Sequence, residues 1–592
     1  MPGFLGYISH KEEVLKHPIN FQELKSINKN LIEEEMNIST DGLYGKIFRN
    51  SVKKFKKDKA FSQSFTSCFV LDGVILNKQR LYKKYNVDDN KMETLIETMD
   101  YLNPSSFFSE FRGTFAGVSL NKKKDVFRLY TNHIGDKEVF YHLDEKNDTL
   151  YFGTDFYSLI VLIQKHCNKK FDINTNGAYS LLSHGHTLCN ETLFEKIYRL
   201  SPGHYLMYSS NGLEKHIYYE MKNKSIEISE PEALKQLNNH FVNAVKSSFD
   251  KDLEYGYKHL VALSGGLDSR MTTWVAHTLG YDNVVNYTFS QTNYYDEKIP
   301  KKISNQLENE WLFKALDNGV YLYNYFDDSL KISGARSYNA TISHTMSMLN
   351  NLNMENFGLV HTGQLGDVIL GTYYENGKKE SFRRGAGAVS SMLINEVYYS
   401  EENAVHIDDL ELFKFYNRGF TGINVGLKPM YEYTETISPF LDIDFMEFCL
   451  SLPFEYRKNH YLYIKWINEF YPEAAEFIYE KVRGKIKHKI IPIKGVPIPW
   501  TSIPSAVLKV TKKKLNMQLN SSSHMNPLDY WYKKNKNLRE FYQTQFSENI
   551  EFIKEESLRE NCEKLFKTGS GTEKNQVITF LGFLKLMDTS IN

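Results

Sequence analysis

The chain has 592 residues, of which 41% are hydrophobic and 14% aromatic, enough for several buried cores. Its 72 lysines and arginines balance 72 aspartates and glutamates, which argues against nucleic acid or an anionic membrane as the main partner. Five cysteines without close spacing, no long apolar run and no signal-peptide pattern argue against a disulfide scaffold, a structural zinc site, a spanning helix and secretion. We therefore expect a cytoplasmic protein of two to four domains.

The first 220 residues are rich in β-strand patterns. Short apolar runs at residues 67–71, 126–131 and 149–153 are separated by Asp, Asn and Gly turns, which is typical of strands. Residues 223–232 are polar and contain a proline, so we expect them to link this first domain, residues 1–220, to the next.

After the linker, strand patterns alternate with helical ones. Apolar residues at three- and four-residue spacing predict a helix over residues 234–245. The strands are predicted at residues 260–263, 284–289, 321–326 and 359–362. This alternation predicts a parallel sheet covered by helices, with ligands bound beyond the carboxyl ends of the strands. We place this second domain at residues 233–500.

The remaining chain, residues 501–592, is predicted to be a helical extension that packs on the second domain. Its clearest element is an apolar pattern at residues 577–587, which predicts a closing helix.

The segment LVALSGGLDSR is the most informative feature of the chain. It predicts a strand, a tight turn and a helix, with Gly265 and Gly266 letting the backbone approach a bound phosphate. Ser264 and Ser269 add hydroxyl donors, and Asp268 adds a carboxylate for a phosphate-bound magnesium ion. No lysine follows the glycines, so this is not a GxxxxGK[ST] nucleotide loop.

A second segment of this kind, HTGQLGDVILGTY, follows the strand predicted at residues 359–362. Thr362 and Gly363 offer backbone amides at a strand end, and Asp367 offers a second carboxylate for magnesium. Taken alone, a glycine-rich turn with one aspartate is structural more often than functional.

Together, the two segments resemble the phosphate-side motifs of the synthetase domain of the asparagine synthetase family. Three further matches occur in the same order, with Glu435 in TETISPFLD, Lys465 in YIKWINEFYPE and Lys485 in an RGK step. The resemblance implies a parallel-sheet domain of the adenine-nucleotide α-hydrolase type that binds ATP and Mg²⁺. Departures are Gln364 and Val368, which stand at positions where the family's asparagine synthetases have glutamate.

The resemblance also assigns roles to individual residues. Asp268 and Asp367 would hold magnesium, Glu435 would act as the base, and Lys485 and Lys465 would offset negative charge. The nucleotide-binding residues would be Leu263, Ser264, Gly265, Gly266, Asp268, Ser269, Thr362 and Gly363.

The N-terminal segments FVLDGVILN, RGTFA, HIGDK and RLSPGH resemble the family's glutaminase domain, which implies an αββα sandwich of the Ntn type. The catalytic cysteine of that domain is replaced by Pro2. Asp72 and Val74 replace the asparagine and glutamate that hold glutamine. Because hydrolysis of glutamine there needs a thiolate, we expect this domain to be inactive.

The expected function is an AMP-forming carbon–nitrogen ligase of the cysteine-less type, similar to β-lactam synthetase and the lasso-peptide cyclases. It would adenylate a small-molecule or peptide carboxylate, release pyrophosphate and transfer the acyl group to an amine without its own glutaminase. Two alternatives stay open. One is an asparagine synthase that uses ammonia or glutamine, and the other is a non-catalytic, nucleotide-binding pseudoenzyme in a biosynthetic complex. A homodimer or a contact with another enzyme of the pathway is also left open.

Overall fold

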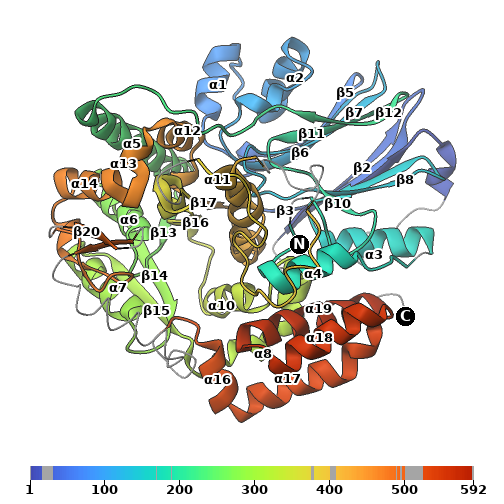
Figure 1. Ribbon diagram of the computed structural model, residues 1–592. Helices are drawn as coiled ribbons and strands as arrows, with labels where there is room; N and C mark the ends of the chain where they lie inside the picture. The colour runs from blue at the N-terminus through green and yellow to red at the C-terminus, as the bar shows by residue number, and fades with distance from the viewer. Residues whose placement is uncertain are drawn as a thin grey trace.

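Three units follow one another along the chain (Figure 1). We call them the N-terminal unit (residues 2–217), the central unit (residues 230–487) and the C-terminal helices (residues 528–589). The computed structural model describes residues 2–16, 31–168, 170–188, 190–374, 379–399, 408–487, 490–493, 496–499 and 524–589. The domain boundary expected at residues 500 and 501 lies outside the described residues.

The N-terminal unit contains two antiparallel sheets of six strands each. The first sheet has the order β10-β8-β9-β1-β3-β2, with β1 (Gly3–Ser9), β2 (Leu31–Ser39), β3 (Tyr44–Val52), β8 (Phe140–Asp144), β9 (Thr149–Gly153) and β10 (Tyr198–Arg199). The second has the order β12-β11-β7-β6-β5-β4, with β4 (Ala60–Gln63), β5 (Ser67–Ile75), β6 (Gly113–Asn121), β7 (Val126–Thr131), β11 (His204–Ser209) and β12 (Gly212–Ile217).

The two sheets pack face to face, and helices cover both outer faces. Ile38 of one sheet and Val70 and Phe127 of the other lie in one buried core between them. The outer face of the first sheet is covered by α3 (Phe156–Cys167) and α4 (Thr175–His184), and that of the second by α1 (Lys78–Tyr85) and α2 (Met92–Leu102). The predicted αββα sandwich is therefore confirmed, as are strands at the three apolar runs of this region.

The central unit is built on a parallel sheet with the order β15-β14-β13-β16-β17. Its strands are β13 (Lys258–Ala262), β14 (Val284–Ser290), β15 (Glu310–Ala315), β16 (Phe357–His361) and β17 (Thr436–Ile437). Because successive side chains of a strand point to opposite faces, Leu260 and Val261 join different cores on the two sides of the sheet. The predicted parallel sheet covered by helices is confirmed.

Helices cover both faces of this sheet. The helices of the central unit are α5 (Glu230–Glu254), α6 (Asp268–Thr278), α7 (Tyr295–Gln306), α8 (Tyr321–Asn324), α9 (Phe326–Ser333), α10 (Ala340–Leu349), α11 (Leu410–Lys414), α12 (Ile443–Ser451), α13 (Phe454–Arg457) and α14 (Tyr461–Phe470). Short strand pairs follow, β18 (Ile478–Tyr479) with β19 (Gly484–Lys485) and β20 (Ile490–Ile493) with β21 (Val496–Pro499).

One predicted strand is wrong. The aromatic run at residues 321–326 lies in the end-to-end helices α8 and α9. The strand that follows β14 along the chain is instead β15, which ends before this run. Tyr and Phe favour strands on propensity alone. Here Tyr321 and Leu322 instead join a helical core that includes Trp531. β15 is an edge strand whose residues stay half-exposed, so its apolar signal is weak.

The C-terminal helices are α16 (Leu528–Lys534), α17 (Lys536–Asn549), α18 (Glu556–Thr568) and α19 (Gly571–Thr589). Figure 1 shows them as a red group beneath both other units. α19 packs against α4 of the N-terminal unit and α9 of the central unit. Among the described residues, none of the helices combines the length and apolar character needed to span a bilayer.

Candidate active site

The loop between β13 and α6 lies at the carboxyl end of a strand of the parallel sheet and lines a cavity there. The N–H of Ser264 donates to Oγ of Ser269 over 2.9 Å, and the two serine hydroxyls are 3.0 Å apart. The N–H of Gly266 donates to Oγ of Ser264 over 3.2 Å. The N–H of Gly265 donates to Oδ1 of Asp296, at the start of α7, over 2.7 Å. The loop is thus held in shape by its own serines and by one carboxylate.

The second motif packs directly against this loop because its glycines leave no room for a side chain. A Cβ atom on Gly363 would lie 2.2 Å from the backbone nitrogen of Ser269. A Cβ atom on Gly366 would lie 2.7 Å from Cγ of Asp268. In addition, the hydroxyl of Thr272 donates to the carbonyl oxygen of Thr362 over 3.2 Å. Two segments about 100 residues apart are therefore joined into one site.

Asp268 and Asp367 are the two carboxylates of this site. The hydroxyl of Tyr463, on α14, donates to Oδ1 of Asp268 over 2.8 Å. Burial, together with the nearby charge of Asp367, raises the pKa of Asp268 to about 8. Nζ of Lys481 lies 4.0 Å from Oδ2 of Asp367. Two carboxylates that disfavour each other's charge suit a divalent cation with oxygen ligands, so the donor set fits Mg²⁺.

A cavity of about 300 Å³ opens from the loop along the sheet end. Most of the predicted nucleotide-binding residues line it, but Gly265 and Asp367 are not among the lining side chains. The predicted residues in its wall are Leu263, Ser264, Gly266, Asp268, Ser269, Thr362 and Gly363. Its other end is apolar, because Phe289, Met430 and Met525 lie there.

The predicted lysines lie outside the lining of this cavity. Nζ of Lys485 is 3.2 Å from Oε2 of Glu476, and both side chains are largely exposed. Lys465 pairs with Glu230 on α5, and its Nζ also lies 3.6 Å from Oε1 of Glu469. In this structure both lysines are paired with surface carboxylates, and their proposed roles stay predictions.

Glu435, the predicted base, is buried and faces the N-terminal unit. Nζ of Lys137 donates to its Oε1 over 2.9 Å and to its Oε2 over 3.0 Å. The Glu435 side chain is only 3% exposed and does not line the cavity. Its role as a base therefore stays a prediction, and its contacts are those of a buried ion pair.

Three side chains near the site had no distinct signal in the sequence as binding groups. Tyr463 is 195 residues from Asp268 along the chain, and Lys481 is also far in sequence from Asp367, so only the fold brings them there. His344 of α10 lines the cavity and stacks on Phe289 with ring centroids 4.6 Å apart. Burial lowers the pKa of His344 to about 4, so the ring is neutral near pH 7.

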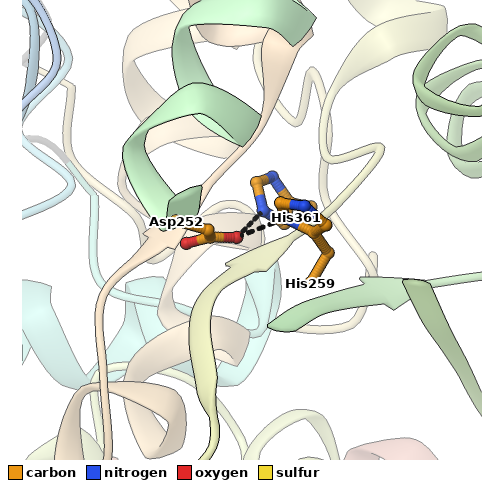
Figure 2. Close-up of side chains that lie close together, drawn as sticks. All are labelled: Asp252, His259 and His361. Carbon is orange, nitrogen blue, oxygen red and sulfur yellow. Dashed lines mark hydrogen bonds and ion pairs between the residues drawn. The ribbon is translucent and has the colours of Figure 1, made fainter. Parts of the chain in front are cut away.

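Beneath the site, two histidines share one carboxylate oxygen, as Figure 2 shows. Nδ1 of His259 and Nε2 of His361 lie 2.8 and 2.7 Å from Oδ2 of Asp252. Oδ1 of Asp252 accepts from the N–H of Leu359 over 2.7 Å. Among the described residues, the outer ring nitrogens have no acceptor of the kind that orients metal-binding histidines. We assign this group as a clasp that fixes β13 and β16 to the end of α5.

Comparison with known proteins adds a family context to this geometry. Residues 57–219 match a glutamine amidotransferase domain family. The chain is 22% identical over 397 residues to a putative glutamine-hydrolyzing asparagine synthetase of Methanocaldococcus jannaschii, covering 67% of this chain. The match spans 66% of the length of that relative.

Two solved structures are also similar to parts of the chain. Glutamine phosphoribosylpyrophosphate amidotransferase from B. subtilis, complexed with ADP and GMP, has a TM-score of 0.27 and 9% identity, covering 53% of this chain and 91% of that chain. A structure described as the allosteric regulatory enzyme of purine biosynthesis has a TM-score of 0.25 and 10% identity, covering 53% of this chain and 80% of that chain. The chain is thus similar to a glutamine amidotransferase domain over residues 57–219 and to an asparagine synthetase over 397 residues.

Proposed function

We propose that the chain is an ATP-dependent, AMP-forming amide ligase. A substrate carboxylate attacks the α-phosphorus of ATP, the bond between the α-phosphorus and the bridging oxygen breaks, and pyrophosphate leaves. An amine then attacks the acyl carbon, the bond to AMP breaks, and the amine gives up a proton as the amide forms. In this proposal the chain carries out both steps without a glutaminase of its own.

The convergence of the two glycine-rich segments on one cavity carries this proposal. Gly363 and Gly366 bring the second segment into contact with the Ser269 backbone and the Asp268 side chain. The same cavity is lined by the serines and amide-bearing residues of the first loop. Backbone amides at a helix start bind phosphate oxygens well, because they are donors that face a favourable dipole.

The residues of the loop would bind the leaving pyrophosphate, chiefly by their N–H groups and by the hydroxyls of Ser264 and Ser269. The N–H groups of Ser264, Gly265 and Gly266 already donate to side chains of Ser269, Asp296 and Ser264, so a phosphate oxygen would have to displace those acceptors. Burial raises the pKa of Asp296 to about 6, which eases its protonation and release when an anion arrives. Mg²⁺, held by Asp268 and Asp367, would neutralise charge that develops on the phosphates.

Two internal residues support an amine source other than the chain's own hydrolysis of glutamine. Val74 is buried, with 1% of its surface exposed, and offers no hydrogen bond to an amide ligand. Asp72 is engaged by Lys137, with Oδ2 and Nζ 2.8 Å apart. The archaeal relative favours one alternative, an asparagine synthase. If the chain alone forms glutamate from glutamine, this would support that alternative and contradict our proposal for the N-terminal unit.

The decisive experiment is ATP–pyrophosphate exchange with a panel of carboxylic acids, including aspartate, amino acids and peptides. We expect exchange that depends on one class of acid and on Mg²⁺. Asp268→Asn should lower it at least about 100-fold, because one of the two carboxylates that would hold Mg²⁺ against the leaving group is lost. Asp442→Asn is the control, since this half-buried carboxyl caps α12 by accepting from the N–H of Phe445 and asparagine can keep that bond. Exchange with no acid in the panel, or equal loss in both variants, would contradict the proposal.

A further inference from the structure

A buried group of four ions joins the N-terminal unit to the end of the parallel sheet. Nζ of Lys137 lies 2.9 Å from Oε1 of Glu435 and 2.8 Å from Oδ2 of Asp72. Nζ of Lys59 lies 3.7 Å from Oδ1 of Asp72 and 3.9 Å from Oε1 of Glu435. The side chains are all 6% exposed or less. Two lysines therefore balance two carboxylates in a place without solvent.

Each charge in this group depends on the others. Burial alone would lower the pKa of Lys137, but the carboxylates of Asp72 and Glu435 outweigh it and raise that pKa above its ordinary value. Burial likewise opposes ionisation of Asp72, but Lys137 and Lys59 hold the pKa of its carboxyl below its ordinary value. Removing one partner from such a group leaves an uncompensated charge in a low-dielectric interior.

The Glu435 segment is tied by its backbone to the strand that carries the second motif. The carbonyl oxygen of Glu435 accepts from the N–H of Val360 over 3.0 Å. Two residues on, the carbonyl oxygen of Ile437 accepts from the N–H of Thr362 over 2.8 Å. Thr362 is also the residue at which that motif enters the cavity wall. A displacement of Glu435 would thus be passed directly to Thr362 and Gly363.

We propose that Lys137 is a positioning residue for the ligase reaction, acting through Glu435. The inference rests on the proposed function and adds a role for the N-terminal unit, which supplies the cation that fixes the edge of the ligase sheet. Glu435 serves to place the motif at residues 362–367, and its carboxylate stays bound to Lys137 while the reaction takes place in the cavity. Asp72, at a position that resembles a glutamine-binding residue, completes the charge balance of this support.

The test compares two buried lysines of the same unit. Lys137→Met removes the cation next to Glu435. The matched control is Lys78→Met, since Lys78 is buried like Lys137 and also bridges to the central unit, pairing with Glu254 over 2.8 Å. Within the described part of the chain, Lys78 contacts Asp58, Glu254 and Tyr255 rather than β17 or the second motif, so it tests the effect of losing a buried interface charge by itself.

The kinetics of ATP–pyrophosphate exchange and the thermal unfolding temperature are measured for the wild-type full chain and for both variants. We expect both substitutions to lower the unfolding temperature. Only Lys137→Met should lower kcat, by about 10-fold or more, with a smaller change in the KM for ATP. A small displacement of the site lowers the reaction rate more than it weakens ATP binding. Lys137→Arg should recover most of the rate. The double variant Lys137→Glu with Glu435→Lys should have a higher kcat than Lys137→Glu alone, because it restores an ion pair.

A second measurement is independent of catalysis. Amide hydrogen exchange should show faster exchange at Val360 and Thr362 in Lys137→Met but not in Lys78→Met. If wild-type protein shows no pyrophosphate exchange, the proposed function fails, while this measurement still decides the positioning role. Unchanged kcat in a folded Lys137→Met variant, or equal losses in both variants, or unchanged protection at those two amides, would overturn the inference.

Discussion

Asp268 and Asp367, the carboxylates proposed to hold Mg²⁺, show how two neighbouring acidic groups cost stability when no cation lies between them. Their charges repel in a partly desolvated place, and Tyr463 is the main hydrogen-bond donor that stabilises the ionised form of Asp268. Functional sites commonly retain such unfavourable groups, because the binding energy of the ligand compensates them later. The raised pKa of Asp268 is thus a property common at functional sites, and it should lower the free energy of unfolding by a measurable amount.

We predict that Asp268→Asn stabilises the metal-free protein at pH 8 while it abolishes exchange. The carboxyl of Asp268 has a folded pKa of about 8 against an ordinary value of 3.8. Between these values the folded state binds the proton and the unfolded state does not, so the free energy of unfolding falls as pH rises. Asparagine removes this loss, and we expect a gain of roughly 1 kcal/mol at pH 8.

Denaturant unfolding in the presence of a chelator, at pH 5 and pH 8, measures this difference. The wild-type protein should lose more stability between the two pH values than the variant does. Added Mg²⁺ should reverse the order at pH 8, since only the wild type gains from binding the ion. A variant with the same pH dependence as the wild type would contradict the shift proposed for Asp268.

Residues of the site could be predicted from the sequence where the signal is local. Ser264, Gly265 and Asp268 form one short motif, so strand, turn and helix could be inferred together. Tyr463 and Lys481 could not, because they meet the aspartates only through the packing of α14 and the turn after β18. Single lysines on polar segments carry little information by themselves, which is why the roles of Lys465 and Lys485 still depend on resemblance alone.

At the scale of elements, the contact between the second motif and α6 depends on two glycines. A side chain at Gly363 would meet backbone atoms of Ser269 and Asp268, which cannot move without shifting the helix. A side chain at Gly366 would meet the side chain of Asp268, whose carboxylate can rotate, although its Cβ, 2.8 Å away, cannot. The two positions therefore differ in how they respond to the same added methyl group.

We predict that Gly363→Ala destabilises the protein by about 2–3 kcal/mol, with Gly366→Ala nearer 1 kcal/mol, because overpacking against backbone costs more. Both should lower pyrophosphate exchange by about 10-fold or more, since both displace the motif or Asp268. Urea unfolding and exchange rates check the two effects separately. If Gly366→Ala is the more destabilised variant, the described packing of the two segments is incorrect.

The clasp of Asp252, His259 and His361 is a second device at this scale (Figure 2). It joins three elements through one carboxylate whose both oxygens accept hydrogen bonds. We predict that Asp252→Ala destabilises the protein by roughly 3–4 kcal/mol, because it leaves several buried groups unpaired. Glu254→Ala, two residues away and half-exposed, should cost about 1 kcal/mol or less.

The clasp should also make the free energy of unfolding depend on pH. Burial lowers the pKa of His361 below its ordinary value of 6.5, and Asp252 opposes that shift only in part. Because the unfolded state then binds the proton first, stability should fall as pH drops below about 6.5. Unfolding measured from pH 7.5 to 5 checks the sign, and stability that rises over this range would contradict it.

The β-rich first region and the parallel sheet could be predicted from periodicity, which is local, whereas the αββα arrangement was predicted only from the family resemblance. The apolar runs of β5, β7 and β14 are continuous and buried, so they were evident. β15 was not, since an edge strand with half-exposed residues lacks that signal. The helices at residues 321–333 show the reverse case, in which tertiary contacts with the C-terminal helices override the strand propensity of aromatic residues.

At the scale of the whole molecule, one hydrophobic core crosses all three units. It contains Phe156 of the N-terminal unit, Leu322 of the central unit and Phe583 of the C-terminal helices. The rings of Phe156 and Phe583 stack with centroids 5.9 Å apart. Buried ion groups at Lys137 and Lys78 add further links between the first two units. Such shared cores make separate unfolding of one unit costly, because its loss exposes the apolar surface of the others.

Because the units share this core, we expect a single unfolding transition. The buried thiols allow the transition to be measured separately in each unit. Cys68 lies in the N-terminal unit, Cys449 in the central unit and Cys562 in the C-terminal helices, and each is 2% exposed or less. Labelling with a thiol reagent across a urea series, followed by peptide mass mapping, gives a separate midpoint for each. We expect the three midpoints to coincide, because no unit can lose the shared core alone.

Asn575 of α19 provides the perturbation that completes this test. Its Oδ1 accepts from the N–H of Ala340 over 3.1 Å, and its Nδ2 donates to Oη of Tyr542 over 2.7 Å. Asn575→Ala should cost about 2–3 kcal/mol, since two buried groups lose their partners. The half-buried Asn561→Ala, which loses one bond to Tyr179, should cost about 1 kcal/mol. All three thiol midpoints should fall together in Asn575→Ala. A fall at Cys562 alone would mean that the C-terminal helices unfold independently and that the shared core does not couple the units.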